Sequence, residues 1–309
     1  MANAPRSRWR HLLVPLVLLA AILFVAGGTY VALTGFDAAR RTGECTAAGL
    51  GTTHSYTTER TANAALISAV AVDRGLPPRA ASIALATAYQ ESKLQNIDYG
   101  DRDSVGLFQQ RPSQDWGTVE QIMDPVYASN AFYDVLVTLD YESMEVNDAA
   151  QKVQRSGYPE AYADHETEGR IFASALTGQS GANLVCDLEP ASGPVNPQDL
   201  QAVLERQFSR SVGAGTITSS LSSTGAALGD GTAPEGAGAT ALVIDPHGDT
   251  ARGWALANWA VAQAGDGGVV QVRYQGQAWT RSDSEQTAGA WPEAPGGDPG
   301  VIVVVVAGG

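Results

Sequence analysis

The chain has 309 residues, with 19 Lys and Arg against 33 Asp and Glu, and its formal net charge is -14 near neutral pH. Nucleic-acid-binding proteins meet the phosphate backbone with clustered cations, and this sequence has no such cluster beyond its N-terminus, so we exclude nucleic acid as a partner. The length allows one large domain or two modest ones.

The N-terminal segment has the pattern of a membrane anchor. Three arginines precede an apolar run from Leu12 to Leu33, and a helix needs about 20 apolar residues to cross a bilayer. The sequence therefore predicts a basic cytoplasmic tail and a signal-anchor helix over residues 1–40, held in the cytoplasmic membrane through residues 12–33, with the rest of the chain extracytoplasmic. The small residues at 26–29 leave cleavage and secretion as the alternative.

The sequence contains two cysteines, Cys45 and Cys186. In an exported protein a lone pair is expected to form a disulfide. Closing so long a loop would stabilise the fold by roughly 4–5 kcal/mol in the chain-entropy model. Two separate buried thiols are the alternative.

Residues 45–190 have the pattern of a helical domain. Gly75 stands where a C-terminal glycine cap belongs, a proline opens the helix before "RAASIALATAYQES", and Asp124 followed by Pro125 marks another helix start. No segment alternates apolar and polar residues convincingly, so we expect no strands here. The predicted helices cover residues 58–75, 76–92, 124–139, 147–159 and 159–178.

Beyond this domain the composition changes twice. Residues 191–240 contain a helix at "NPQDLQAVLERQF" and then a Gly-, Ser-, Ala- and Thr-rich stretch, 209–240, which predicts a flexible linker because it has little apolar surface to bury. Residues 241–309 predict a small α/β module that ends in a central apolar strand, "GVIVVVVAGG". Its tryptophans either contribute to binding a cell-wall protein partner or pack the interior.

The segment "ATAYQESKLQNIDYGDRDSVGLFQQRPSQDWG", residues 86–117, carries the clearest chemical signal. Glu91 stands at the end of a small-residue helix, and Leu107 and Phe108 follow in the same segment. Cleaving a glycosidic bond needs a carboxylic acid whose pKa is raised by desolvation, so that it still holds its proton near neutral pH. The residues alone leave two interpretations of Glu91, a solvated helix-end charge or a working acid.

"AYQESKLQ", a short acid-rich loop and "VGLFQQRP" together resemble the lysozyme-like lytic transglycosylases and their goose-type lysozyme relatives. Those proteins carry Glu-Ser at a helix end and Gly-Leu-Met-Gln further along, matched here by Glu91-Ser92 and by "GLFQ" at residues 106–109. The resemblance covers roughly residues 58–178. It implies a mainly α lysozyme-like domain that acts on peptidoglycan glycan strands. The chain is then expected to be a lytic transglycosylase or muramidase that cleaves the N-acetylmuramic acid–N-acetylglucosamine bond outside the cytoplasmic membrane.

The resemblance also implies residue roles. Glu91 becomes the catalytic acid and Asp101 its helper, with a plain loop-capping role as the alternative for Asp101. Ser92 is expected to support the fold around Glu91 at the edge of the substrate site. The remaining substrate-binding positions are Gln109, Gln110, Trp116 and Tyr158, and the two aromatics among them either stack on sugars or belong to the core.

Two departures from the family pattern bear on the mechanism. The second acid of the goose-type proteins is replaced by Gln110 and Arg111, which favours the lytic route, because that route needs a single carboxylic acid. The Asn-x-Gly that lines the family's cleft has Gln154 and Gly157 as its nearest equivalents here. This change keeps a non-catalytic peptidoglycan-binding or scaffold protein as the alternative function.

No metal or cofactor is expected. The four histidines lie far apart, and the sequence contains neither HExxH nor Cys-x-x-Cys.

Overall fold

The structure is a computed structural model that describes residues 43–155, 160, 162–229, 233–281, 283 and 286–308. Contacts divide the chain into two units, Met1–Thr42 and Gly43–Gly309, and all described residues belong to the second. The predicted anchor, Leu12 to Leu33, lies outside the described residues. Among the described helices, none is both long and apolar enough to cross a membrane.

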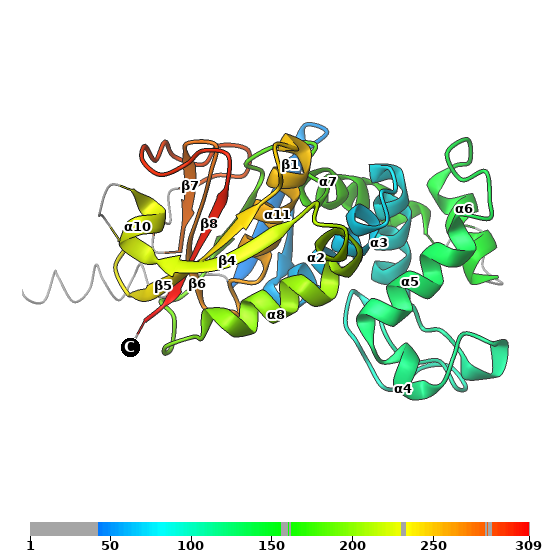
Figure 1. Ribbon diagram of the computed structural model, residues 1–309. Helices are drawn as coiled ribbons and strands as arrows, with labels where there is room; N and C mark the ends of the chain where they lie inside the picture. The colour runs from blue at the N-terminus through cyan, green and yellow to red at the C-terminus, as the bar shows by residue number, and fades with distance from the viewer. Residues whose placement is uncertain are drawn as a thin grey trace, which may run out of the picture. The chain divides into compact units, whose positions relative to one another are not determined.

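The second unit is an α+β fold with two antiparallel sheets (Figure 1). The prediction of a mainly α lysozyme-like domain followed by a small α/β module was therefore wrong. The first sheet has the order β2-β1-β3 and the second has the order β4-β5-β8-β6-β7. Because the second sheet has no parallel pair of neighbouring strands, it is not built from the β-α-β units that define the α/β class.

The first sheet lies inside the region that was predicted to be all helical. It consists of β1 (Glu44–Gly49), β2 (Thr52–Thr57) and β3 (Leu184–Asp187). Its strands are short and its buried side chains on β1 are Cys45 and Ala47. Small residues of this kind give little apolar alternation, so the period-two signal that identifies a strand is weak.

Three of the predicted helices are confirmed with the expected caps, whereas those predicted over 147–159 and 159–178 are shorter, Val146–Gln154 and Glu166–Leu176. Helix α2 (Thr58–Asp73) ends before Gly75, whose φ is +67°. Helix α3 (Pro78–Ser92) begins with proline at its first position. Helix α5 (Pro125–Leu136) begins after Asp124, whose side chain accepts from two backbone N–H groups of the first turn. The other elements of this region are η1 (Pro112–Gln114), α4 (Val119–Ile122), α6 (Val146–Gln154), η2 (Ala163–His165) and α7 (Glu166–Leu176).

The stretch predicted as a flexible linker is structured in most of its length. After α8 (Pro197–Gln207) come α9 (Ser209–Gly213), β4 (Thr218–Ser223), α10 (Thr224–Leu228) and β5 (Ala237–Asp245). Strand β4 is polar and half-exposed, and it is an edge strand that pairs with β5. An edge strand needs little apolar surface of its own, because its backbone hydrogen bonds and its neighbour hold it. Composition alone therefore misjudged this segment.

Strand β8 (Ile302–Ala307) is central and all six of its residues are buried, as the apolar run predicted. It lies between β5 and β6 (Val269–Tyr274), and β6 forms a hairpin with β7 (Gln277–Thr280). The hairpin turn at Gln275-Gly276 has both residues at positive φ, as a two-residue turn between twisted strands requires.

Helix α11 (Thr250–Ala262) joins the C-terminal sheet to the helices. It packs against α2, α7 and β6. The Asn258 side chain is fully buried; it accepts from the backbone N–H of Leu184 on β3 and donates to the carbonyl oxygens of Ala175 and Gly181. Trp259 and Trp279 are also buried, so these two tryptophans belong to the interior.

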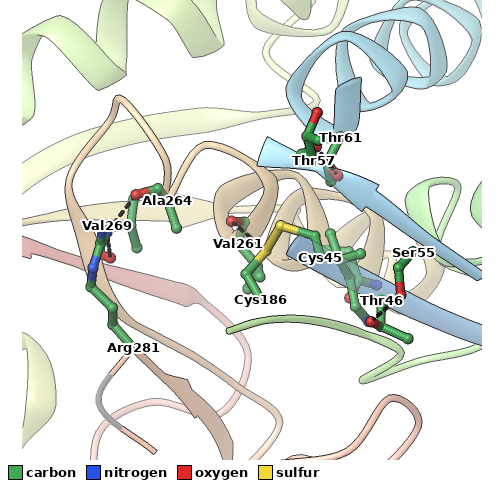
Figure 2. Close-up of a disulfide and its surroundings, with 12 residues drawn as sticks. Cys45, Thr46, Ser55, Thr57, Thr61, Cys186, Val261, Ala264, Val269 and Arg281 are labelled. Carbon is green, nitrogen blue, oxygen red and sulfur yellow. Dashed lines mark hydrogen bonds between the residues drawn. A yellow bond between two sulfur atoms is a disulfide. The ribbon is translucent and has the colours of Figure 1, made fainter. Parts of the chain in front are cut away.

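The predicted disulfide between Cys45 and Cys186 is present (Figure 2). The two residues lie directly opposite each other on β1 and β3, and 141 positions separate them in the sequence. The Sγ of Cys186 lies 3.7 Å from the Val261 carbonyl oxygen of α11. The disulfide is thus part of the first sheet and lies next to α11, the helix that also packs against β6 of the second sheet.

Candidate active site at the end of helix α3

Glu91 lies in the last turn of α3, where the helix is stopped by two consecutive residues in the left-handed region. Lys93 has a φ of 57° and Leu94 a φ of 60°. Neither residue is a glycine, and left-handed backbone costs about 1 kcal/mol or more for side chains with a Cβ. The Leu94 side chain is fully buried, which offsets that cost through packing. The turn fixes where the helix ends and so where the Glu91 carboxyl lies.

The carboxyl of Glu91 is held through one of its oxygens. Oε1 accepts a hydrogen bond of 2.6 Å from the Tyr162 hydroxyl and one of 3.1 Å from Nε2 of Gln154. The same Gln154 nitrogen donates to the carbonyl oxygen of Phe108 at 2.7 Å. Within the described residues, Oε2 of Glu91 has no hydrogen bond. An acid with both donors on Oε1 carries its own proton on Oε2, the oxygen that is left to act.

Burial raises the pKa of Glu91 above the usual value for a glutamate. The hydrogen bonds from Tyr162 and Gln154 act in the opposite direction, because they stabilise the ionised form. Desolvation is the larger effect, and the pKa stays raised. The interpretation of Glu91 as a solvated helix-end charge therefore does not fit its surroundings, and the raised pKa lets the carboxyl keep its proton to higher pH than an exposed glutamate does, as a proton donor requires.

Three segments converge on Glu91. Gln154 is the last residue of α6, Tyr162 immediately precedes η2, and Phe108 belongs to the "GLFQQ" segment. Ser92 ties that segment to the helix, because its buried Oγ donates to the Leu107 carbonyl oxygen at 2.7 Å. The spacing between "ES" and "GLFQ" thus has a direct structural meaning: the second motif folds back onto the end of α3.

The turn that carries Tyr162 is anchored by a second polar cluster. His165 Nδ1 lies 2.8 Å from Oε1 of Glu168 on α7, and its Nε2 lies 2.9 Å from Oε1 of Gln90 on α3. Gln90 precedes the candidate acid directly in sequence. The cluster therefore fixes η2 against both helices that border the site, which helps to hold the Tyr162 hydroxyl in place.

The two glutamines that follow Phe108 have structural positions. Gln109 turns its Nε2 to the carbonyl oxygens of Tyr99 and Gly106, at 3.2 and 3.3 Å. Gln110 is buried and donates to the Ala128 carbonyl oxygen at 3.2 Å. Gln109 therefore braces the acid-rich loop, and Gln110 binds α5. Neither is turned toward Glu91 by these contacts.

The structure does not bring Asp101 to Glu91 through any hydrogen bond among the described residues. The Asp101 side chain is 92% exposed and lies 3.9 Å from Arg102. The acid that caps the loop is Asp103, which accepts from Nε of Arg111 at 2.8 Å and from Ser113. These bonds hold the pKa of the Asp103 carboxyl well below its usual range.

The two predicted stacking aromatics have different outcomes. Trp116 is half-buried and packs against the hydrophobic core, which fits its interpretation as a core residue at least in part. Tyr158 lies outside the described residues. Tyr162, which does contact Glu91, was missed, because a single buried tyrosine leaves no motif or spacing in the sequence.

Within the described part of the chain, no group of three or more His, Cys, Asp or Glu residues is placed to hold a metal ion. Comparison with known proteins adds no assignment: no protein-family model matches the sequence, and a search of curated proteins finds no significant match. The chemistry of the site must therefore be argued from its own geometry.

Proposed function

We propose that the chain is a peptidoglycan-cleaving glycosidase, a lytic transglycosylase that acts on the N-acetylmuramic acid–N-acetylglucosamine bond outside the cytoplasmic membrane. The proposal rests on the Glu91 carboxyl. Burial raises its pKa, and two hydrogen-bond donors bind it through Oε1 alone. The match of "ES" and "GLFQ" to the lysozyme-like pattern supplies the substrate class.

In the proposed reaction, Oε2 of Glu91 donates its proton to the glycosidic oxygen as the bond to the anomeric carbon breaks. The bonding electron pair leaves with that oxygen. The carboxylate then accepts the proton of the sugar's own 6-hydroxyl, whose oxygen bonds to the anomeric carbon and gives a 1,6-anhydro product. Glu91 is restored to its acid form, so one residue serves as acid and then as base.

The lytic route is preferred over hydrolysis because Gln110 and Arg111 stand where the goose-type pattern has its second acid, and the lytic route needs a single carboxylic acid. Hydrolytic glycosidases use two carboxylates that flank the bond. The proposed helper, Asp101, is almost fully exposed and faces Arg102. Its exposed position and its contact with Arg102 do not favour a role in activating water.

The location belongs to the same proposal. Membrane attachment through residues 12–33 and export of the remainder would place the site next to the cell wall. The Cys45–Cys186 disulfide supports an oxidising compartment, because such bonds form and persist outside the cytoplasm. The alternative is a non-catalytic peptidoglycan-binding role, and the test must distinguish it from glycosidase activity.

The test uses the full chain with purified peptidoglycan and compares wild type with Glu91→Gln. Wild type is expected to release muropeptides, and the substitution should lower the rate by roughly 10²- to 10⁴-fold, the contribution of a general acid. Glu205→Gln, which changes an exposed glutamate on α8, is the matched control and should leave the rate unchanged.

Mass spectrometry of the products then distinguishes anhydro ends from reducing ends. Reducing ends would replace the lytic route by hydrolysis. If wild type releases nothing, or if Glu91→Gln matches wild type, the enzyme proposal fails. Retained binding to insoluble peptidoglycan in that case would favour the non-catalytic alternative.

A further inference from the structure

A cavity of about 320 Å³ lies at the N-terminal end of α3, whereas Glu91 lies at the C-terminal end of the same helix. Ligand pockets in proteins commonly measure roughly 300–1,000 Å³, so a small ligand would fit. The walls come from the β1–β2 hairpin, the start of α3, α6 and α7. Glu91 does not line this cavity, and the proposed glycosidase reaction makes no use of it.

The polar lining of the cavity consists of donors and contains no carboxylate. Arg79 and Arg170 contribute two guanidinium groups, and Ser82, Ser174 and Gln179 contribute neutral side chains. The cavity lining thus holds two cations and no acid, although the chain as a whole has a net charge of -14. Its charge favours an anionic ligand.

Arg79 is the more informative of the two cations because it lacks a counter-charge. Its Nε donates to the Tyr141 carbonyl oxygen at 3.1 Å, and its Nη2 donates to the Met144 carbonyl oxygen. No carboxylate of the described residues lies within ion-pair distance of it. A half-buried guanidinium has lost part of its hydration, and two carbonyl dipoles compensate a full charge only in part. Three of its five N–H donors remain for a ligand.

The charge of Arg170 is partly neutralised by Glu166, yet its side chain is also available to a ligand. Its Nη1 lies 3.4 Å from Oε1 of Glu166, and its side chain is 51% exposed. An exposed pair of this kind is worth little and rearranges easily. Arg79 and Arg170 come from the neighbouring helices α3 and α7, and both line the cavity.

The remaining walls are apolar. Val146 and Ile171 line the cavity but are themselves buried, so its accessible apolar surface comes from Pro78 and from Leu50, which is 64% exposed at the hairpin tip. An exposed leucine beside two arginines suits a ligand that combines an anionic group with small apolar groups. Serine and glutamine side chains between them suit amide groups.

We propose that this cavity binds the C-terminal carboxylate of a short peptide. The planar, forked guanidinium matches a carboxylate with two parallel hydrogen bonds, the neutral polar side chains meet the peptide amides, and the apolar walls meet small side chains. This site is separate from Glu91 and does not rest on the proposed glycosidase activity.

The test measures ligand binding to the full chain by isothermal titration calorimetry. Acetyl-alanyl-alanine with a free carboxylate is compared with its C-terminal amide, and sodium phosphate is the third ligand. The free acid should bind, and the amide should bind more weakly by roughly tenfold or more, the size expected for hydrogen bonds to a charged group. Phosphate should bind more weakly than the dipeptide.

Matched variants locate the binding. Arg170→Gln should weaken dipeptide binding roughly tenfold, whereas Arg206→Gln should leave it unchanged; both change an exposed arginine in a surface ion pair on a helix, and Arg206 does not line the cavity. Ser174→Leu, which replaces a small side chain of the cavity lining by a larger one, should abolish binding.

Arg79→Lys keeps the charge but not the fork, and it should also weaken binding. Glu91→Gln should bind the dipeptide as wild type does, which separates this proposal from the glycosidase proposal. The proposal is overturned if acid and amide bind equally, if the dipeptide does not bind, if phosphate binds more tightly, or if Ser174→Leu binds like wild type.

Discussion

At the scale of single residues, the properties of Glu91 come from a balance between burial and two hydrogen bonds. Desolvation raises its pKa, and the Tyr162 hydroxyl and the Gln154 amide lower it. Because both donors bind Oε1, they also decide which oxygen is available. The two effects can be separated by substitution.

Tyr162→Phe removes one donor and keeps the ring. Without this hydrogen bond the ionised form of Glu91 is less stable, so its pKa rises further. The reaction needs the protonated acid in the free enzyme, so the activity lost as pH rises should be lost at higher pH in the variant. A pH profile of kcat/KM measures the shift.

Tyr133→Phe is the control for this substitution. Tyr133 is also a fully buried tyrosine, but its hydroxyl donates to the Ile67 carbonyl oxygen. Its removal should lower stability and leave the pH profile in place. If Tyr162→Phe gave the wild-type profile, the hydroxyl would have no influence on the acid.

Glu91→Gln should also change how stability depends on pH. Since the folded-state pKa lies above the unfolded value of 4.5, the folded state binds the proton more tightly, and stability falls as pH rises from that value through the raised pKa. Glutamine carries no charge, so the variant should be the more stable protein at pH 8 and similar to wild type at pH 4. Each unit by which the pKa is raised corresponds to about 1.4 kcal/mol.

Denaturant unfolding at both pH values measures this difference. The control is Glu205→Gln, because the exposed side chain of Glu205 has no burial cost to lose. The burial of a charge would be contradicted if the difference in unfolding free energy between Glu91→Gln and wild type were the same at pH 4 and at pH 8.

Residue-level inference from the sequence named Glu91 but only part of its surroundings. Glu91 and Gln154 were named because a motif and its spacing place them, and they are in contact. Gln109 and Gln110 were assigned to substrate from residue type, although their amides satisfy backbone carbonyls elsewhere. The direction of a side chain depends on the fold of its loop, which the neighbouring residues in the sequence do not specify.

At the scale of elements, the contact between α11 and β3 holds the two sheets together. From α11, Asn258 makes three hydrogen bonds to backbone groups: one with Leu184 on β3, one with Ala175 on α7 and one with Gly181 between those two elements. Buried backbone groups need partners, so a side chain amide that serves three of them is difficult to replace.

Asn258→Ala should lower the free energy of unfolding by about 3–5 kcal/mol, because it leaves three buried groups without partners at about 1–3 kcal/mol each, partly relieved by relaxation. Denaturant unfolding of the full chain measures the loss. Asn196→Ala removes only an N-cap bond at the start of α8 and should cost about 1 kcal/mol. Equal losses in the two variants would contradict the role of Asn258.

Helices were easier to predict than strands, for a physical reason. The ends of α2, α3 and α5 are marked by local residues, such as the Asp124 cap, that act within one turn. Strand β1 pairs with β3, far away in the sequence, and β2 and β4 are polar strands with few apolar residues. Local composition does not contain that information.

At the scale of the whole molecule, the disulfide closes the chain from β1 to β3 around the candidate active site. Cys45 and Cys186 are 141 positions apart, and the chain-entropy model assigns such a loop about 5 kcal/mol as an upper value. The presence of two cysteines in a chain that was expected to be exported was enough to predict the pair.

Adding a reductant should therefore lower the melting temperature of wild type, and the double substitution Cys45→Ala with Cys186→Ala should be less stable than oxidised wild type by about 3–5 kcal/mol. Reductant should have no further effect on the double variant. Calorimetry with and without reductant measures both. A wild type that is indifferent to reductant would show that the bridge contributes nothing.

The central place of β8 has a consequence for how the molecule folds. The hairpins β4–β5 and β6–β7 are each local in the sequence, but they have no contact as a sheet until β8 pairs with β5 on one side and β6 on the other. Until then each hairpin exposes one open, apolar edge, the kind of surface that recruits other chains. Closure of this sheet is a non-local and therefore slow step. Strand β8 makes the finished sheet continuous, and the folding chain is most prone to aggregate in the time before β8 pairs.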